Sequence, residues 1–276
     1  MMVYVAFHRA GEIISNDKMY IPLQVGKKNN NTELNMPDDA TGNNISDKNG
    51  IYSELTGWYW IWKNTKHDYV GTSHYRRYFT IEKPSPIHKI GEFFLFLAGQ
   101  KLKRHGLFFV HSVRRWHYKI LTEQQAESFM QQYDAVLPVK KKFPYTVYEQ
   151  YKRRHNERDI IIVRQIISEL QPDYLEAFDN TFASKEMYSF NMFIFKWKFF
   201  DEYMNWLFGI LFELEKRSEI NFDDNYQKRV CAFMAERLQT VWINKNNLKV
   251  KELFVLYFKK HKKEHLKGIR SNLNND

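Results

Sequence analysis

Residues 68–79 constrain the fold of this chain more than any other stretch. They read Asp-Tyr-Val-Gly-Thr-Ser-His-Tyr-Arg-Arg-Tyr-Phe, and the Tyr-Val-Gly part is typical of a short buried strand. Directly after it, residues 74–78 bring together three basic side chains and two phenols. Open α/β sheets bind ligands at the carboxyl edge of their strands, and an arginine guanidinium can bind two phosphate oxygens at once. The segment therefore predicts an anion-binding site at a sheet edge, and the alternative is a basic turn in solvent.

The charge and the cysteine content narrow the class of protein. A formal net charge of +10 over 276 residues favours an anionic partner, such as nucleic acid, a nucleotide or an acidic membrane surface. Cys231 is the single cysteine, which excludes an internal disulfide and a cysteine-based zinc site and favours a reducing compartment. No basic region precedes the first apolar run, and no apolar run is long enough to span a bilayer. We therefore expect neither a signal peptide nor a membrane span, and a cytoplasmic location.

Apolar runs and helical periodicity predict an α/β fold. Residues 3–7 predict the first, central strand, with His8 and Arg9 at its carboxyl end. Residues 20–26 predict a second extended piece that its proline keeps off a central ladder position. Further strands are expected at residues 134–138 and 190–195, and helices at residues 51–63, 122–132, 158–170, 197–217 and 225–241. We expect one mixed, mainly parallel sheet flanked by helices, with helical additions, in a single domain of residues 1–258.

Residues 27–50 form a polar stretch rich in Asn, Asp and Gly, which predicts a loop. It contains Asp38, Asp39, Asn44 and Lys48. Their carboxylates and amides could contact a base or a ribose, so we interpret the stretch as a ligand loop. The alternative is an ordinary connection, because the same residue types are favoured in turns.

Two segments are strongly basic. Residues 84–119 hold seven Lys or Arg residues against Glu92, a net charge of +6, around the apolar run 93–98. An aromatic, basic helix can lie in a membrane interface, so this segment is expected to face a membrane. The alternative is a helix packed on the core with a solvated basic face. Residues 259–276 are predicted to be a basic tail.

Common nucleotide and metal motifs are absent from the sequence. It has no Gly-x-Gly-x-x-Gly, no phosphate-binding loop motif and no His-Glu-x-x-His. The basic residues are spread over several segments, and no DNA-reading module stands out. From charge alone, a non-catalytic protein that binds nucleic acid or another polyanion remains the alternative function.

Several motifs together resemble one bacterial family. They are Asp-Asp-x-x-Gly-x-Asn-Ile-Ser-x-Lys-Asn from Asp38, the block at residues 68–79, Tyr-Asp-Ala-Val-Leu-Pro from Tyr133 and Asn-Met-Phe-Ile-Phe from Asn191. The family was long described as a domain of unknown function, and its members occur among capsule, exopolysaccharide and O-antigen biosynthesis proteins. One branch is the galactofuranosyltransferase domain of a bifunctional O-antigen polymerase. The resemblance covers roughly residues 3–243.

The resemblance implies a nucleotide-sugar-dependent glycosyltransferase with a GT-A-like α/β domain. The donor would be a UDP-sugar, with UDP-galactofuranose as one candidate, and the transfer would be inverting. The acceptor would be a lipid-linked glycan, extended at the inner face of the plasma membrane, where the anionic membrane surface is a further partner. A nucleic acid is then not expected as a partner.

The residues suit a site without a cofactor. Where many such enzymes hold a metal through Asp-x-Asp, this chain has His74, Tyr75, Arg76 and Arg77, whose fixed positive charge could stabilise a leaving diphosphate. The alternative is that Mg²⁺ or Mn²⁺ binds the loop carboxylates. The expected donor-binding residues are His8, Asp38, Asp39, Asn44, Lys48, His74, Tyr75, Arg76 and Arg77.

An inverting transfer also needs a general base. Glu149, in a basic setting after the strand at 134–138, is the preferred candidate, and Asp224 is the second. For either carboxylate, the alternative is a salt bridge or a helix cap.

Overall fold

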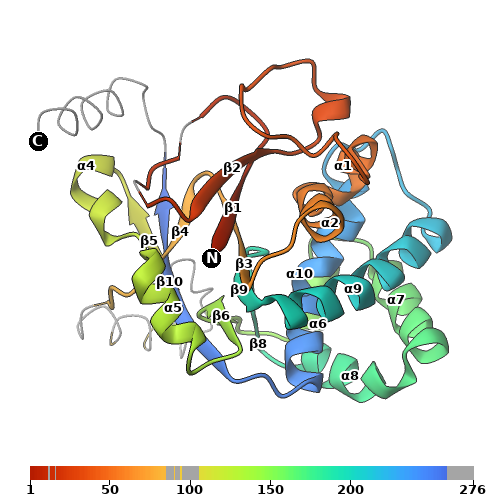
Figure 1. The fold of residues 1–276 in the computed structure, drawn as a ribbon. Helices are drawn as coiled ribbons and strands as arrows, with labels where there is room; N and C mark the ends of the chain where they lie inside the picture. The colour runs from red at the N-terminus through yellow and green to blue at the C-terminus, as the bar shows by residue number, and fades with distance from the viewer. Residues whose placement is uncertain (12, 16, 85–89, 91–93, 95–105, 260–276) are drawn as a thin grey trace, which may run out of the picture.

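A computed structural model describes all residues except 12, 16, 85–89, 91–93, 95–105 and 260–276 (Figure 1). Its large sheet contains β1 (Met2–Phe7), β2 (Tyr20–Gln24), β3 (Tyr69–His74), β4 (Arg77–Thr80), β5 (Leu107–Val110), β6 (Ala135–Pro138), β9 (Phe193–Lys196) and β10 (Val250–Phe258). A separate two-stranded sheet pairs β7 (Lys141–Lys142) with β8 (Glu186–Met187) in antiparallel orientation.

The described helices have these bounds: α1 (Asn49–Tyr52), α2 (Leu55–Asn64), α4 (Val113–Trp116), α5 (Glu123–Met130), α6 (Val147–Lys152), α7 (Glu157–Leu170), α8 (Leu175–Ala183), α9 (Trp197–Arg217) and α10 (Val230–Lys245). Short 3₁₀ turns lie at η1 (Lys27–Asn29), η2 (Ser46–Lys48), η3 (His117–Lys119), η4 (Pro172–Tyr174) and η5 (Gln227–Arg229). Thr122 forms a capping box with Gln125 at the start of α5, within the helix predicted at residues 122–132.

The four predicted strands lie in one sheet, as expected. β1 is parallel to both β2 and β3, and β9 is antiparallel to β3 and β6. The prediction of a mainly parallel sheet is not confirmed, because four of the eight pairings among the described strands of the large sheet are antiparallel. The antiparallel pairings come from β9, which runs against β3 and β6, and from β4, which runs against β3 and β10. The sequence analysis missed β10, which runs parallel to β5 and β6.

The sheet separates two apolar clusters. Side chains alternate between the faces of a strand, and in β9 Phe193 and Phe195 point to one face while Ile194 points to the other. The first face packs against α1, α2 and α6–α10, and the second against α4, α5 and the segment around Ile14 and Met19 (Figure 1). The mixed sheet flanked by helices is therefore confirmed.

The helix predicted at residues 51–63 is interrupted. Ser53 has φ +50° and ends α1, and α2 begins at Leu55. Neither Asn49 nor Ser46 caps α2, because the Asn49 amide donates to the Ser53 carbonyl and the Ser46 hydroxyl donates to Asp39. At this interruption the Ser53 hydroxyl accepts a hydrogen bond from Arg229 Nε at 2.8 Å.

Both segments expected to meet a membrane fall partly outside the described residues. Of the apolar run 93–98 only Phe94 is described, and the tail is described only at Lys259. None of the helices that the structure describes is long and apolar enough to cross a bilayer.

The close approach of β3 to β1 and β9 requires a glycine at position 71. A Cβ on Gly71 would lie 2.9 Å from the Phe193 carbonyl oxygen and 3.0 Å from Val3 Cγ2. Gly71→Ala should therefore destabilise the protein by about 1–3 kcal/mol, measured by denaturant unfolding.

Gly209→Ala is the matched control. Gly209 is exposed within α9, and a Cβ there meets no atom within 4 Å. The substitution should stabilise by about 0.5–1 kcal/mol, because alanine favours a helix interior. Equal effects of the two substitutions would contradict the packing described for β3.

Candidate active site

The basic cluster is a hairpin turn held from both sides. Tyr75 and Arg76 form the turn between β3 and β4, and His74 pairs with Arg77 across it. The Tyr75 N–H donates to the Ala6 carbonyl of β1 at 3.3 Å, and the Arg76 carbonyl accepts from the Phe258 N–H of β10 at 2.8 Å. The turn is thus part of the sheet edge, as predicted, and not a free loop in solvent.

The polar groups of this turn are only partly satisfied. Within the part of the chain that the structure describes, the buried Tyr75 hydroxyl and the Nε atoms of Arg76 and Arg77 have no hydrogen-bond partner. Their guanidinium groups instead lie over aromatic rings: Arg76 is 5.0 Å from the Tyr75 ring, and Arg77 is 5.3 Å from the Phe190 ring. Buried donors without acceptors are costly, so this arrangement is suited to an anionic ligand.

His74 does not contribute the positive charge that the sequence analysis assigned to it. Burial and the neighbouring Arg77 lower the pKa of His74 to about 2. Its Nδ1 accepts a hydrogen bond from the Arg76 N–H at 3.3 Å. The pKa of His8 is lowered as well, by burial and then by Arg9. The cluster therefore carries two fixed charges, those of Arg76 and Arg77, beside two neutral imidazoles.

A cavity of about 310 Å³ opens at the carboxyl ends of β1 and β3. His8 and His74 line one side, and Glu54, Lys228 and Arg229 line the other. The Tyr75 ring lies 5.3 Å from the His8 ring and 4.3 Å from the His74 ring, so the arginine turn adjoins this cavity. His8 and His74 thus line the cavity, whereas Tyr75, Arg76 and Arg77 lie next to it and are not among its lining residues.

Asp39 has a structural environment. It is fully buried, and its carboxylate accepts hydrogen bonds from the Gly26 and Lys27 N–H groups and from the hydroxyls of Ser46 and Thr56, at 2.5–3.1 Å. Protein donors therefore occupy both carboxylate oxygens. These contacts join the end of β2 to η2 and α2, and they do not fit a metal ligand. Among the described residues, no group of three or more His, Cys, Asp or Glu side chains is arranged to hold a metal ion.

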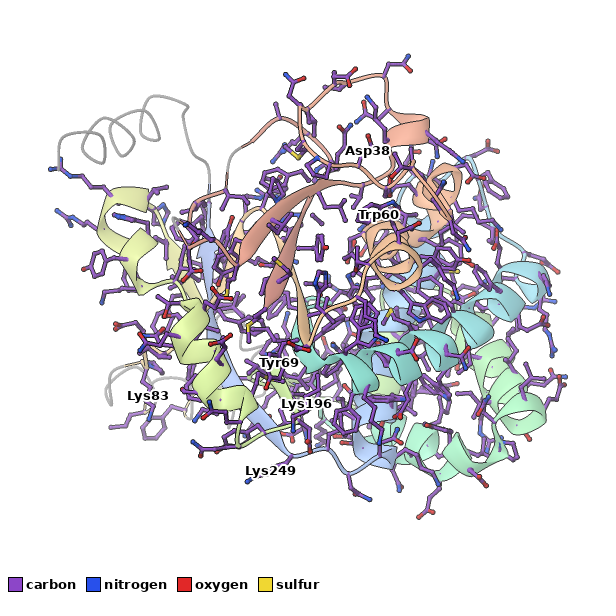
Figure 2. The ribbon with its side chains drawn as sticks, in the orientation of Figure 1. Asp38, Trp60, Tyr69, Lys83, Lys196 and Lys249 are labelled. Atoms are coloured by element: carbon purple, nitrogen blue, oxygen red, sulfur yellow. The ribbon has the colours of Figure 1, made fainter. Side chains whose placement is uncertain are left out.

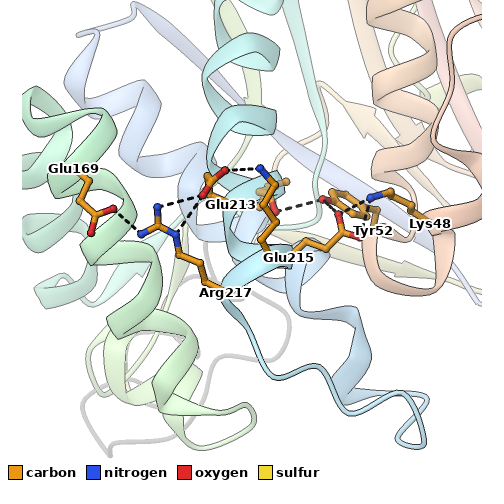
Figure 3. A network of polar contacts seen from close by, with 8 residues as sticks. Lys48, Tyr52, Glu169, Glu213, Glu215 and Arg217 are labelled. Carbon is orange, nitrogen blue, oxygen red and sulfur yellow. Dashed lines mark hydrogen bonds and ion pairs between the residues drawn. The ribbon is translucent and has the colours of Figure 1, made fainter.

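The other loop candidates also make internal contacts. Asp38 lies at the carboxyl end of the sheet, far from Tyr69 at the start of β3 (Figure 2), and its Oδ1 accepts from the Ala40 N–H. The Asn44 amide donates to three carbonyls of its own loop, the closest at 2.9 Å. Lys48 forms an ion pair with Glu215 of α9 at 2.8 Å, and Tyr52 donates to the same carboxylate (Figure 3). The loop is therefore tied to the fold, and Lys48 does not line the cavity.

The two predicted catalytic carboxylates accept hydrogen bonds from nearby backbone N–H groups, Glu149 in a helix capping box and Asp224 in a local turn. Glu149 is exposed and completes the capping box of α6 by accepting from the Thr146 N–H at 3.1 Å. Asp224 accepts from the N–H groups of Tyr226 and Gln227, which lowers its pKa. Neither residue lines the cavity described above.

Two carboxylates that the sequence analysis missed lie closer to the arginine turn. Glu54 accepts from the Asn191 amide, and Glu236 accepts from the Phe190 N–H, each at 2.7 Å. Phe190 and Asn191 have φ values of +81° and +51°, a conformation rare for residues with side chains and frequent at functional sites. An asparagine is compatible with that conformation, but nothing in the sequence signals it for Phe190.

Comparisons with known proteins give this site a context. The model of the family described as "Domain of unknown function (DUF4422)" matches residues 2–247. The chain belongs to this family. It is also similar to the apo structure of WbbM, a bifunctional glycosyltransferase, with 31% identity and a TM-score of 0.82 over 94% of this chain. The chain spans 45% of the WbbM chain. A search of curated proteins found no match.

His74 should make the stability of this DUF4422 protein sensitive to acid. Because its folded pKa lies below the ordinary value near 6.5, the unfolded state binds more protons between these values, and stability falls as the pH drops below about 6.5. His74→Asn should reduce the loss of unfolding free energy between pH 7 and pH 5 by roughly 1 kcal/mol. Denaturant unfolding at both pH values measures this.

His117→Asn is a suitable control for that measurement, because His117 follows α4 and its ring contacts the Val113 carbonyl at the start of that helix. Comparison with this variant separates the effect of His74 from the general effect of replacing a histidine by asparagine. An identical pH dependence in wild type and His74→Asn would show that His74 is not buried as a neutral group.

Proposed function

We propose that this chain is a glycosyltransferase that uses a nucleotide-sugar donor. The observation that carries the proposal is the similarity to a glycosyltransferase over 94% of the chain, joined to a half-buried arginine pair whose buried Nε atoms have no hydrogen-bond partner among the described residues. The bifunctional neighbour is longer than this chain, so the donor, the acceptor and the pathway are parts of the proposal. A UDP-sugar, with UDP-galactofuranose as a candidate, and a capsule, exopolysaccharide or O-antigen glycan follow from the family resemblance.

The donor would lie in the cavity between β1, β3 and η5. Its diphosphate would be held by Arg76 and Arg77, whose guanidinium groups are positioned before the substrate arrives because the turn is bonded to both β1 and β10. Fixed positive charge in a partly dry site stabilises charge that develops on a leaving diphosphate. The reaction would therefore need no metal, and Asp39, whose oxygens accept protein donors, has no part in it.

An inverting transfer needs a base beside the acceptor hydroxyl. We place Glu54 in this role in preference to Glu149 and Asp224, which accept hydrogen bonds from nearby backbone N–H groups. Glu54 lines the same cavity as His8 and His74, and its bond to Asn191 fixes the carboxylate beside the arginine turn.

Substitution of the arginine pair tests the donor role. Arg76→Ala or Arg77→Ala should slow transfer from a UDP-sugar by roughly ten- to a hundredfold, because each removes charge-assisted bonds of about 1.5–3 kcal/mol. Lysine should restore only part of the rate, since it cannot bind two oxygens as a fork does. Assays of donor hydrolysis and of transfer, with and without EDTA, measure the rates of the alanine and lysine variants.

Arg164→Ala provides the control, because Arg164 is exposed on α7 and pairs with Asp179. It should leave the rate unchanged, and EDTA should have no effect on the wild type. Full activity of both turn variants, or loss with EDTA and recovery with Mn²⁺, would refute the metal-free mechanism. Binding of nucleic acid without any donor hydrolysis would instead favour a non-catalytic polyanion-binding protein.

The proposal includes attachment to an anionic membrane surface. Among the described residues of the basic segment, Tyr118 is 67% exposed and Phe94 is 64% exposed, and the cations Arg114 and Arg115 are exposed on α4, shortly before Tyr118 in the sequence. Exposed aromatic side chains together with basic residues suit a lipid headgroup layer.

Liposome sedimentation tests this attachment. The protein should bind vesicles that contain anionic lipid more tightly than neutral vesicles, and a double Arg114→Gln, Arg115→Gln variant should bind them severalfold more weakly. Arg164→Gln should behave as the wild type. Equal partitioning of the wild type to both kinds of vesicle would disprove the attachment.

A further inference from the structure

A second cavity lies near Phe190, the residue whose ring Arg77 of the arginine turn also contacts. It measures about 150 Å³ and lies between β7, α6 and α10. Arg77 and Lys141 both contact the Phe190 ring, at 5.3 and 5.5 Å, and Lys141 lines the second cavity. The two cavities are therefore neighbours separated by the segment with positive φ values.

The second cavity contains an excess of positive charge. Lys141, Arg154 and Arg237 line it, with Glu236 as the only carboxylate among its lining residues. Within the described residues, the Lys141 and Arg154 side chains make no ion pair or hydrogen bond, and burial followed by nearby cations lowers the pKa of Lys141. Gathering like charges in a partly buried cavity is unfavourable unless an anion neutralises them.

Arg237 is built into this cavity. It is only 3% exposed, and it donates to Glu236, to the Phe233 carbonyl and to Gln150. Its buried Nε has no partner among the described residues. Glu236 is shared with the Phe190 N–H, so one carboxylate serves both a buried guanidinium and a backbone donor. The cavity is therefore lined by a buried guanidinium that still has a free hydrogen-bond donor.

The wall of this cavity is aromatic. The rings of His155, Tyr226 and Phe233 gather with centroids 4.1–5.7 Å apart. Burial and Arg237 lower the pKa of His155 to about 4, so its imidazole is neutral near pH 7. Flat aromatic faces beside polar groups suit the apolar face of a sugar ring, and Tyr226 is exposed enough for a ligand to reach it.

We propose that this second cavity binds the acceptor through an anionic group, a phosphate or a carboxylate, carried next to a sugar ring that rests on the aromatic wall. The inference rests on the proposed glycosyl transfer, because it assigns the acceptor to a place beside the donor cavity. Lys141, Arg154 and Arg237 bind the anion, and Phe190 separates it from the donor diphosphate. Both lipid-linked glycans, which carry phosphate, and acidic sugars present this chemistry.

Binding of small probes to the full chain tests the inference without any need for activity. Glucose 1-phosphate represents a glycosyl phosphate, methyl glucuronoside an acidic sugar, and methyl glucoside a neutral one, and calorimetric titration measures each. At least one acidic probe should bind more tightly than the neutral probe, and which one does so identifies the source of the anion. Lys141→Gln and Arg154→Gln should each weaken that binding by about tenfold.

Lys142→Gln is the matched control, because Lys142 adjoins Lys141 in β7, is exposed and does not line the cavity. It should bind the probes as the wild type does. Saturating UDP should not displace the acidic probe, and UDP binding, measured separately, reports on the donor proposal alone. Equal binding of all three probes, equal losses in Lys142→Gln and Lys141→Gln, or displacement of the probe by UDP would each overturn the inference.

Discussion

The pairing of β3 with β1 on one side and β9 on the other determines where the chemistry of this protein is placed. Gly71 allows the three strands to approach closely, and the hairpin turn that follows β3 is then bonded to both β1 and β10. The arginine pair cannot move away from the sheet edge without breaking these backbone contacts. Preorganised charge of this kind is useful only when the scaffold holds it in place.

Charge balance explains much of the surrounding structure. The two imidazoles near the turn have lowered pKa values, so they add no further positive charge beside Arg76 and Arg77. Glu54 and Glu236 are each tied to the Phe190–Asn191 segment, one toward each cavity. This arrangement leaves both cavities short of negative charge, which is what a site for two anionic substrates requires.

In the polar loop of residues 27–50, charged side chains stabilise the fold through contacts with other parts of the protein. Asp39 is buried, and four protein donors satisfy it, a condition that offsets the desolvation of a carboxylate. Lys48 and Tyr52 share Glu215, which joins the loop and α1 to α9 (Figure 3). The loop thus shapes one side of the cavity at the ends of β1 and β3 through its position.

The sequence by itself determined several strands of the sheet, most of the long helices and the basic turn, because apolar periodicity and the composition of residues 68–79 are local signals. Only the tertiary structure decided which side chains face the site. Asp39, Glu149 and Asp224 are acidic residues in suitable places along the chain, yet their hydrogen bonds make them a loop contact, a helix cap and a turn contact. Glu54 comes from the turn between α1 and α2, Glu236 and Arg237 come from α10, and β10 enters the sheet from residues 250–258. Long-range pairings of this kind depend on the packing of the whole fold, which no local pattern in the sequence records.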